Sequence, residues 1–413
     1  MHFFVIIFLL LAGCKTVAPI ATPRANIGIQ VRSLTSGKVL YEQNPNELFI
    51  PASTLKIFTV ATALAILKPS YQFETKVYYH QGDLYLQGSG DPEFSTHRLS
   101  DISARIKQLV KEPIQNIIVD DSVFDRNYFG LGWEDEDMGK GFAAPISGIN
   151  VDYNRLVLTF LPGGKVLLEP FTKYVTLTTT KTTYELKGLG IAVQGTIPKV
   201  TRPQYKTYAI MNPPDWAGFL FKEQLQKAGV KVKGEIQEGF VPSGLTPITT
   251  SFSPYLSEML INYTKFSRNL GNEAVLKTLG NGHFEQGLQK IEDFVGLGHR
   301  IVDGSGLSRQ NAITPAQMTA FLVRVANDFQ IAPEFTAALP IAGQDGTLKN
   351  VFLAESFKGK IRAKTGYMTG VKALTGYFRT KTSETVAFTV FANENKSTSH
   401  ELQRWLEHIL GSL

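Results

Sequence analysis

Apolar and polar residues alternate along this chain with two different periods. A strand-like run occupies residues 27–41, and a turn-forming break at residues 35–38 predicts a hairpin. Apolar residues then recur at helical spacing at Ile57, Val60 and Leu64, which predicts a helix with one buried stripe. The helical pattern returns after residue 254, and three adjacent strand-like runs precede a closing helix near the C-terminus. The two periods together predict an α+β protein.

The stretch from about residue 70 to residue 247 differs in character from its flanks. Short alternating runs dominate it, and residues 156–198 are almost entirely alternating β-branched and polar residues around a turn at Pro162. We therefore expect three units: a helix-flanked antiparallel sheet at 25–68 and 248–413, a mostly β insertion at 69–155 and 199–247, and a nested small β module at 156–198.

The first residues have the pattern of a secretion signal. An uninterrupted apolar run at residues 3–12 has signal-peptide length and is too short to cross a bilayer. Small residues then precede Cys14, the single cysteine of the chain, as in a bacterial lipobox. We expect a signal peptide at residues 1–13, a lipid on Cys14, and a Pro-, Ala- and Thr-rich tether at residues 14–24. The alternative is an ordinary cleaved signal with an incidental cysteine, since no Lys or Arg precedes the apolar run.

Composition narrows the class of protein. Of 413 residues, 43% are hydrophobic and 19% are charged, which is a globular balance. The net charge of +6 suits an anionic neighbour, such as envelope polymer or a membrane surface. There is no dense Lys/Arg block, no Gly-rich phosphate loop and no metal-binding pair among the seven histidines. We therefore expect no nucleic-acid partner and no metal.

Three short motifs carry the candidate chemistry. They are Ser53-x-x-Lys56, Ser267-x-Asn269 and Lys364-Thr365-Gly366, in that order. Taken singly, they have ordinary explanations as a helix cap, a turn and a strand end. Taken together, they supply a nucleophile, a base, a proton relay and an anion-binding group, which is the motif set of penicillin-recognising serine enzymes.

The first two motifs fit acyl transfer. A serine hydroxyl is a poor nucleophile unless a base removes its proton. Lys56 shares a helical face with Ser53, and its amine can act as that base if burial or a second cation, such as Lys364, keeps it neutral. Ser267 can relay a proton toward the leaving amine, and Asn269 can orient Lys56 and hold the substrate peptide.

The third motif fits a terminal carboxylate. Lys364 offers a fixed positive charge and Thr365 a hydroxyl donor, on a predicted strand beside the cleft. Gly366 lacks a side chain, which lets a substrate strand approach the backbone closely. The run Asp303-Gly304-Ser305-Gly306 is interpreted as a turn and not as a catalytic element.

With these motifs, the chain resembles the D-alanyl-D-alanine carboxypeptidase/endopeptidase group of class C low-molecular-mass penicillin-binding proteins. The resemblance covers most of the chain after the signal, and these segments carry it: 51–56, 88–92, 119–124, 303–309, 339–343, 345–348 and 363–366. It implies a transpeptidase/β-lactamase-like domain that a large insertion splits between the first two motifs. It also implies that Ser53 cleaves the terminal D-Ala of peptidoglycan stem peptides, or the D-Ala cross-link between them, and that penicillins acylate it.

The resemblance further implies details of the site and its location. The backbone N–H groups of Ser53 and Tyr367 would form the oxyanion hole, and the family uses no metal or organic cofactor. Many relatives are soluble in the periplasm, and Lys15 after the cysteine resembles lipoproteins of the outer membrane. We therefore expect a periplasmic enzyme that is lipid-anchored to the outer membrane through Cys14.

The chain departs from the family pattern at three places. Arg268 stands where Asp or Asn is common, Tyr367 stands where a small Ser or Thr is usual, and the lipobox is not typical. A β-lactamase or esterase on the same scaffold stays an alternative, although no base for deacylation can be assigned and the long insertion favours a polymer substrate. An inert lipoprotein that binds cell wall is a second alternative, disfavoured because all required side chains are present. The balance of carboxypeptidase and endopeptidase activity stays open.

Overall fold

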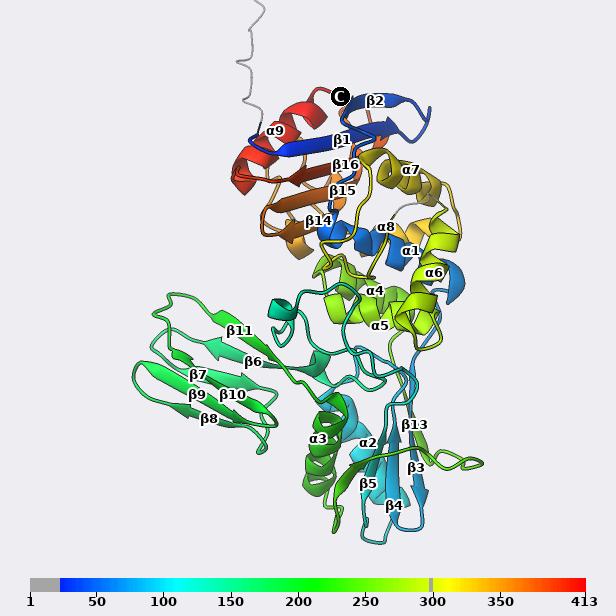
Figure 1. Ribbon diagram of the computed structural model, residues 1–413, viewed down its shortest axis with the longest axis vertical. Helices are drawn as coiled ribbons and strands as arrows, with labels where there is room; N and C mark the ends of the chain where they lie inside the picture. The colour runs from blue at the N-terminus through cyan, green and yellow to red at the C-terminus, as the bar shows by residue number, and fades with distance from the viewer. Residues whose placement is uncertain (1–22, 297–299) are drawn as a thin grey trace, which may run out of the picture.

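The computed structural model, which describes residues 23–296 and 300–413, joins the two ends of the chain in one five-stranded antiparallel sheet (Figure 1). The strand order is β14-β15-β16-β1-β2. The bounds are Asn26–Ser33 for β1, Val39–Gln43 for β2, Ile361–Met368 for β14, Val371–Arg379 for β15 and Thr385–Asn393 for β16. The predicted N-terminal hairpin and the three predicted strands near the C-terminus are therefore confirmed.

Helices cover both faces of this sheet. On one face α9 (Ser399–Gly411) packs Trp405 and Leu406 into a core that includes Phe388 of β16. The next strand residues alternate, so Ala387 and Phe391 face a second core on the other side. Six helices build that core: α1 Lys56–Ile66, α4 Leu256–Lys265, α5 Asn269–Leu279, α6 Phe284–Val295, α7 Pro315–Ala326 and α8 Ala332–Ala338.

The helix α1 lies at the centre of the second core. Residues 56–64 are all buried, so the helix is enclosed on every side and not along a single stripe as predicted. Its sequence explains this, because the run from Ile57 to Ile66 carries no charged residue. Lys56 at its first position is the one charged side chain that this helix buries.

Between α1 and α4 the chain builds a second sheet, which lies at the lower end of Figure 1. Its order is β12-β5-β4-β3-β13, with bounds Glu74–His80 for β3, Asp83–Gln87 for β4, Ile117–Asp120 for β5, Ile236–Glu238 for β12 and Thr249–Phe252 for β13. The strands β4 and β5 are parallel, and α2 (Thr96–Leu109) forms the crossover between them. A further helix, α3 (Pro213–Lys227), contributes Trp216 and Leu220 to the same core.

Two three-stranded sheets form the nested β region at the side of Figure 1. One is β11-β6-β7, with bounds Gln204–Ala209, Arg155–Phe160 and Val166–Glu169, and the other is β10-β9-β8, with bounds Ile191–Thr196, Thr183–Gly188 and Thr176–Thr179. β11 lies beyond the expected boundary at residue 198 but pairs with β6. Similarly, β13 lies beyond the expected boundary at residue 247 but pairs with β3. We propose that the nested module extends to residue 209 and the insertion to residue 252.

The described chain begins against the C-terminal part of the first sheet. The Arg24 amide donates to Ser397 Oγ at 2.7 Å, and the Lys396 amide donates to the Arg24 carbonyl at 2.9 Å. The expected signal peptide, Cys14 and most of the expected tether lie outside the described residues. In residues 23–296 and 300–413, none of the helices has the length and apolar character of a membrane span. The same residues contain no cluster of three or more His, Cys, Asp or Glu side chains that could bind a metal ion.

Candidate active site

Ser53 lies in a single 3-10 turn, Ala52–Leu55, that leads directly into α1. Ala52 has a φ of 46°, in the left-handed region that alanine rarely adopts, so the turn is held in place by its surroundings. The Thr54 hydroxyl donates to the Pro51 carbonyl at 2.6 Å. A Cβ on Gly306 would lie 2.0 Å from the Ala52 carbonyl oxygen, so the loop around this glycine packs tightly against the turn. These contacts fix the position of the Ser53 hydroxyl.

Lys56 brings the first two motifs together. Its Nζ lies 2.9 Å from Ser53 Oγ, 2.7 Å from Asn269 Oδ1 and 2.5 Å from the carbonyl oxygen of Ser305. The side chain is fully buried. When the amine is neutral, its lone pair can accept a hydrogen bond from the Ser53 hydroxyl while its two N–H groups donate to the other two oxygens. This geometry suits proton transfer from serine to lysine.

Burial lowers the pKa of Lys56 to about 7, against the opposing attraction of Asp303 and Glu273. A large fraction of the amine is therefore neutral near neutral pH. From the sequence we expect a second cation, such as Lys364, to help lower the pKa of Lys56. In the structure the effect runs from Lys56 to Lys364: burial, and then the charge of Lys56, lower the pKa of Lys364.

Ser267 is hydrogen-bonded to the third motif, and among the described residues it has no hydrogen bond to Ser53 or Lys56. Lys364 Nζ donates to Ser267 Oγ at 2.9 Å and to the Thr365 carbonyl at 2.6 Å. Ser267 has a φ of 56°, an unusual conformation for a residue with a side chain, and it lies between α4 and α5. Such strained residues concentrate at functional sites, where neighbouring contacts hold them. The fold therefore joins two motifs that lie 97 positions apart in the chain.

The edge of β14 is open beside the site. The Ala363 amide donates to Pro340 and the Ala342 amide donates to Ile361, so the main-chain groups of alternate residues point away from β15. Continuing this alternation, the N–H group of Tyr367 points to the same edge. No backbone hydrogen bond from another described segment covers this edge at Tyr367. An extended peptide can therefore add to the sheet here.

Thr365 and Gly366 have distinct roles in the geometry. The Thr365 hydroxyl donates to Thr347 Oγ1 at 2.7 Å, which places two hydroxyl groups side by side at the strand edge. A Cβ on Gly366 would lie 2.8 Å from the Pro51 carbonyl oxygen and 3.1 Å from the Ala52 Cβ. The missing side chain thus lets β14 pack against the turn that carries Ser53. Gly366 therefore has a packing role in addition to the one expected from the sequence, which is to let a substrate strand approach.

Several residues that contact the site were not found from the sequence. Glu273 lies one helical turn after Asn269 on α5, and its two carboxylate oxygens accept from the Gly304 amide at 3.0 and 3.2 Å. Burial and the neighbouring Asp303 raise the pKa of Glu273 to about 8. The i, i+4 spacing of Asn269 and Glu273 was a signal that could have identified it.

The loop at Asp303 is a turn, as interpreted from the sequence, and it also shapes the site. Asp303 accepts from Trp133 Nε1 at 3.0 Å and from the amides of Gly306 and Ser308 at 2.8 Å each. These bonds curl the loop so that the Ser305 carbonyl points at Lys56. Because a carbonyl accepts from either form of the amine, this contact positions the base without fixing its charge.

Arg268 lies where the insertion meets the second motif. Its guanidinium carbon and that of Arg155 are each 5.1 Å from the centre of the Tyr153 ring. Within residues 23–296 and 300–413 neither arginine forms an ion pair, and Arg268 Nε is buried without a hydrogen-bond partner. Burial and the charge of Arg268 lower the pKa of Arg155. Both arginines line a cavity of about 140 Å³ together with Ser267 and Asn269.

The fold and the geometry of the site are those of a class of serine hydrolases in which a buried lysine lies beside the serine, in place of a histidine. The chain belongs to the D-Ala-D-Ala carboxypeptidase 3 (S13) family, which it matches over residues 17–410. The predicted family resemblance and the α+β fold of the transpeptidase/β-lactamase type are thereby confirmed.

One relative supports the family assignment, and two solved structures share the fold. A D-alanyl-D-alanine carboxypeptidase from Actinomadura sp. (strain R39) is 30% identical over 417 residues, which cover 89% of this chain and 77% of that protein. The crystal structure of penicillin binding protein 4 from Haemophilus influenzae matches with a TM-score of 0.78 at 22% identity, covering 94% of this chain and 96% of the other. A predatory peptidoglycan endopeptidase from Bdellovibrio bacteriovorus matches with a TM-score of 0.58 at 15% identity, covering 95% and 94%.

Proposed function

We propose that this protein is a penicillin-sensitive serine D-Ala-D-Ala peptidase that cleaves peptidoglycan stem peptides through an acyl-enzyme. The observation that carries the proposal is the 2.9 Å contact between Ser53 Oγ and the Nζ of Lys56, whose pKa burial lowers to about 7. The carboxypeptidase activity in the name of the Actinomadura relative supports the reaction, and the peptidoglycan named for the Bdellovibrio enzyme supports the substrate.

Acylation begins with the neutral amine of Lys56. It takes the proton of the Ser53 hydroxyl as Oγ attacks the carbonyl carbon between the two D-Ala residues. The tetrahedral oxyanion is stabilised by the backbone N–H groups of Ser53 and Tyr367. The direction of the Tyr367 N–H, toward the open edge of β14, supports this assignment.

Expulsion of D-Ala requires a proton on the leaving amine. Ser267 supplies it from its hydroxyl and is held in place by Lys364, which donates to Ser267 Oγ at 2.9 Å. The proton that Lys56 took from Ser53 then restores the Ser267 hydroxyl, which resets both groups. Because Ser267 is bonded to Lys364 in the free enzyme, this transfer requires Ser267 to approach Lys56 in the substrate complex. Water then attacks the acyl-enzyme carbonyl and releases the shortened peptide, restoring the Ser53 hydroxyl.

The substrate lies along the open edge of β14. Its terminal carboxylate replaces Thr347 Oγ1 as the acceptor of the Thr365 hydroxyl and accepts a second hydrogen bond from the Thr347 hydroxyl. The amine of Lys364, whose pKa burial lowers, adds electrostatic attraction when it carries a proton. Asn269 donates through Nδ2 to the Phe142 carbonyl at 3.0 Å, which sets its amide beside the insertion and within reach of the substrate peptide. The insertion thus borders the cleft, consistent with a polymer substrate.

Labelling with a fluorescent penicillin tests this function. We expect the purified protein to keep the label through a one-hour chase, and the Ser53→Ala variant not to label. Loss of the label within minutes would instead identify a β-lactamase, and absence of any label would identify a catalytically inert wall-binding protein.

The protein's location is part of the same proposal. A periplasmic site is where peptidoglycan substrate is available, and acylation of Cys14 would tether the enzyme to the outer membrane. Palmitate labelling of cells that express the full chain tests the anchor, with a Cys14→Ser variant as the control. Equal incorporation in both proteins, or none in either, would reject it.

A further inference from the structure

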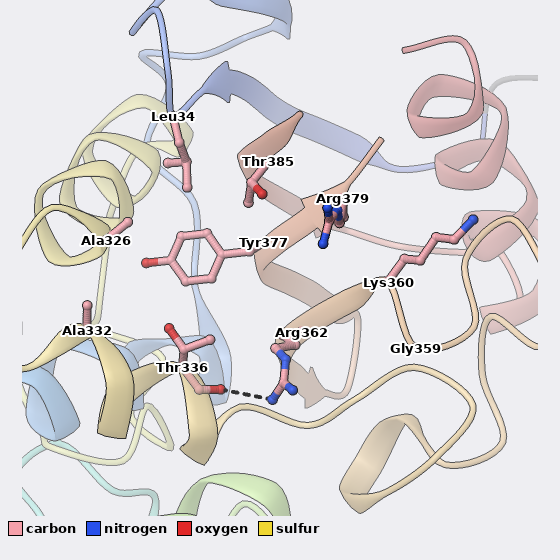
Figure 2. A pocket seen from close by; sticks show the side chains of 10 residues that line it. All are labelled: Leu34, Ala326, Ala332, Thr336, Gly359, Lys360, Arg362, Tyr377, Arg379 and Thr385. Carbon is pink, nitrogen blue, oxygen red and sulfur yellow. Dashed lines mark hydrogen bonds between the residues drawn. The ribbon is translucent and has the colours of Figure 1, made fainter. Parts of the chain in front are cut away.

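A cavity of about 710 Å³ lies away from Ser53, at one end of the five-stranded sheet (Figure 2). This volume is typical of clefts that bind small ligands. One wall is formed where β14 begins, β15 ends and β16 begins. The opposite wall is formed by the end of α7 at Ala326 and by Ala332 and Thr336 of α8.

Three cations line this cavity and no carboxylate does. They are Lys360, Arg362 and Arg379. In the described parts of the chain none of the three forms an ion pair, and Arg362 makes one long contact, from Nη1 to the Thr336 carbonyl at 3.5 Å. Most of their N–H donors are therefore free for a ligand.

The loop between β15 and β16 does not neutralise the positive charge of the cavity. Glu384, the acidic residue between β15 and β16, accepts a hydrogen bond from Ser33 Oγ instead of pairing with Arg379. By contrast, Arg98 in the insertion is bonded to the buried carboxylate of Asp91. A concave wall with surplus positive charge attracts anions and concentrates them locally.

The rest of the lining is apolar or carries hydroxyl groups. The Tyr377 ring projects from the sheet into the cavity, and its hydroxyl donates to the Leu322 carbonyl at 2.8 Å, which fixes the ring (Figure 2). Leu34 adds apolar surface, and Thr336 and Thr385 add hydroxyls. These groups suit a carboxylate on a short peptide with aliphatic side chains. A flat membrane surface would not enter such a recess.

We propose that the cavity bounded by Lys360, Arg362 and Arg379 is a second binding site, which takes a carboxylate-bearing stem peptide of peptidoglycan outside the catalytic cleft. The inference rests on the proposed function, because a second site for stem peptides is useful only to an enzyme whose substrate is a polymer that carries many of them. The two sites share β14, since Arg362 and Lys364 lie on one face of that strand at a spacing of about 7 Å. A polymer held at the second site raises the effective concentration of its other peptides at Ser53.

Calorimetric titration of the full chain tests this proposal. The ligand is a soluble muropeptide with a tripeptide stem, which lacks D-Ala-D-Ala, and the protein is first acylated with penicillin to close the catalytic cleft. We expect saturable binding that weakens at least tenfold in an Arg362→Gln/Arg379→Gln double variant. A Lys181→Gln/Lys199→Gln variant, which loses two exposed charges in the nested module, is expected to bind as the parent does.

Arg362 is half-buried, so the Arg362→Gln/Arg379→Gln variant could lose binding because it misfolds. A second variant that leaves Arg362 unchanged controls for this. Lys360→Gln/Arg379→Gln changes only exposed side chains and is also expected to weaken binding. No binding to the parent, or equal binding by the cavity variants and the control, would overturn the proposal. Inorganic phosphate binding as tightly as the muropeptide, or binding to vesicles of anionic phospholipid without binding to the muropeptide, would overturn the assignment of the ligand.

The outcome for the catalytic function is separate. The cavity variants are expected to hydrolyse a short D-Ala-D-Ala peptide at the parent's rate, because cleavage of a peptide with a single stem does not require the second site. A parent protein that fails to react with penicillin would refute the proposed function. The muropeptide titration on that unreacted protein would still decide the fate of the second site.

Discussion

Lys364 Nζ donates a hydrogen bond to Ser267 Oγ at 2.9 Å, across 97 residues of sequence. This contact connects the second motif to the third, while Asn269, two residues after Ser267, contacts Lys56 of the first. One short segment thus has a hydrogen bond to each of the two buried lysines. The local backbone serves both, because the positive φ of Ser267 turns its side chain toward β14 before α5 begins.

Removing the Ser267 hydroxyl should slow acylation by penicillin. We expect Ser267→Ala to lower the acylation rate constant by about 10²- to 10⁴-fold, the usual effect of losing one proton-transfer group. Ser267→Gly is the matched control, because it also lacks the hydroxyl but relaxes the backbone at a φ of 56°. Similar losses in both variants would assign the effect to the hydroxyl. Near-normal acylation in either would contradict the relay.

The acylation rate should follow the charge of Lys56. Because the neutral amine is the active form and the pKa is lowered to about 7, the rate should rise as pH rises through about 7 and level off above it. Stopped-flow acylation measured from pH 5.5 to 9 would show this profile. Lys56→Arg keeps a permanent charge and should lose at least about 10³-fold in rate. A flat profile between pH 6 and 8 would rule out this lysine as the base.

Glu273 should make the fold less stable as pH rises. Its folded pKa, raised to about 8, exceeds the unfolded value of about 4.3, so the stability that it contributes is complete below that value and is lost toward pH 8. Up to about pH 6 Lys56 is mostly protonated in both states, and its titration near pH 7 is common to the parent and to Glu273→Gln. The melting temperature of Glu273→Gln, relative to the parent, should therefore increase from pH 5 to pH 7. A constant difference across this range would count against a protonated Glu273.

Arg268 should influence which stem peptides are preferred. It and Arg155 place two unpaired cations beside Ser267, so a substrate carboxylate can bind there. We expect Arg268→Asn to lower kcat/KM about tenfold for a peptide with a free side-chain carboxylate, equivalent to about 1.4 kcal/mol, and to spare the amidated peptide. Arg202→Asn removes an exposed arginine of the nested region and serves as the control. Equal losses for both peptides would indicate a structural role.

Local sequence accounts for much of the fold. The hairpin at the N-terminus, the helix after Ser53, the strands β14 to β16 and the closing helix α9 were predicted from periodicity and turn residues. Such patterns depend on neighbouring positions, which is why they can be read from one sequence. The module boundary at residue 198 could not be placed in this way, because β11 belongs with β6 only through pairing across about 50 residues.

The sequence by itself determined which groups are available and in which order: a serine, two lysines, an asparagine and a strand that carries Lys364-Thr365-Gly366. Only the tertiary structure decided what those groups do. Burial lowers the pKa of Lys56, and the Ser305 carbonyl and Glu273 lie near its amine. Arg155 and Arg268, from distant segments, lie against the same Tyr153 ring. Desolvation and contacts between distant segments control these properties, and neither is encoded in the spacing of residues along the chain.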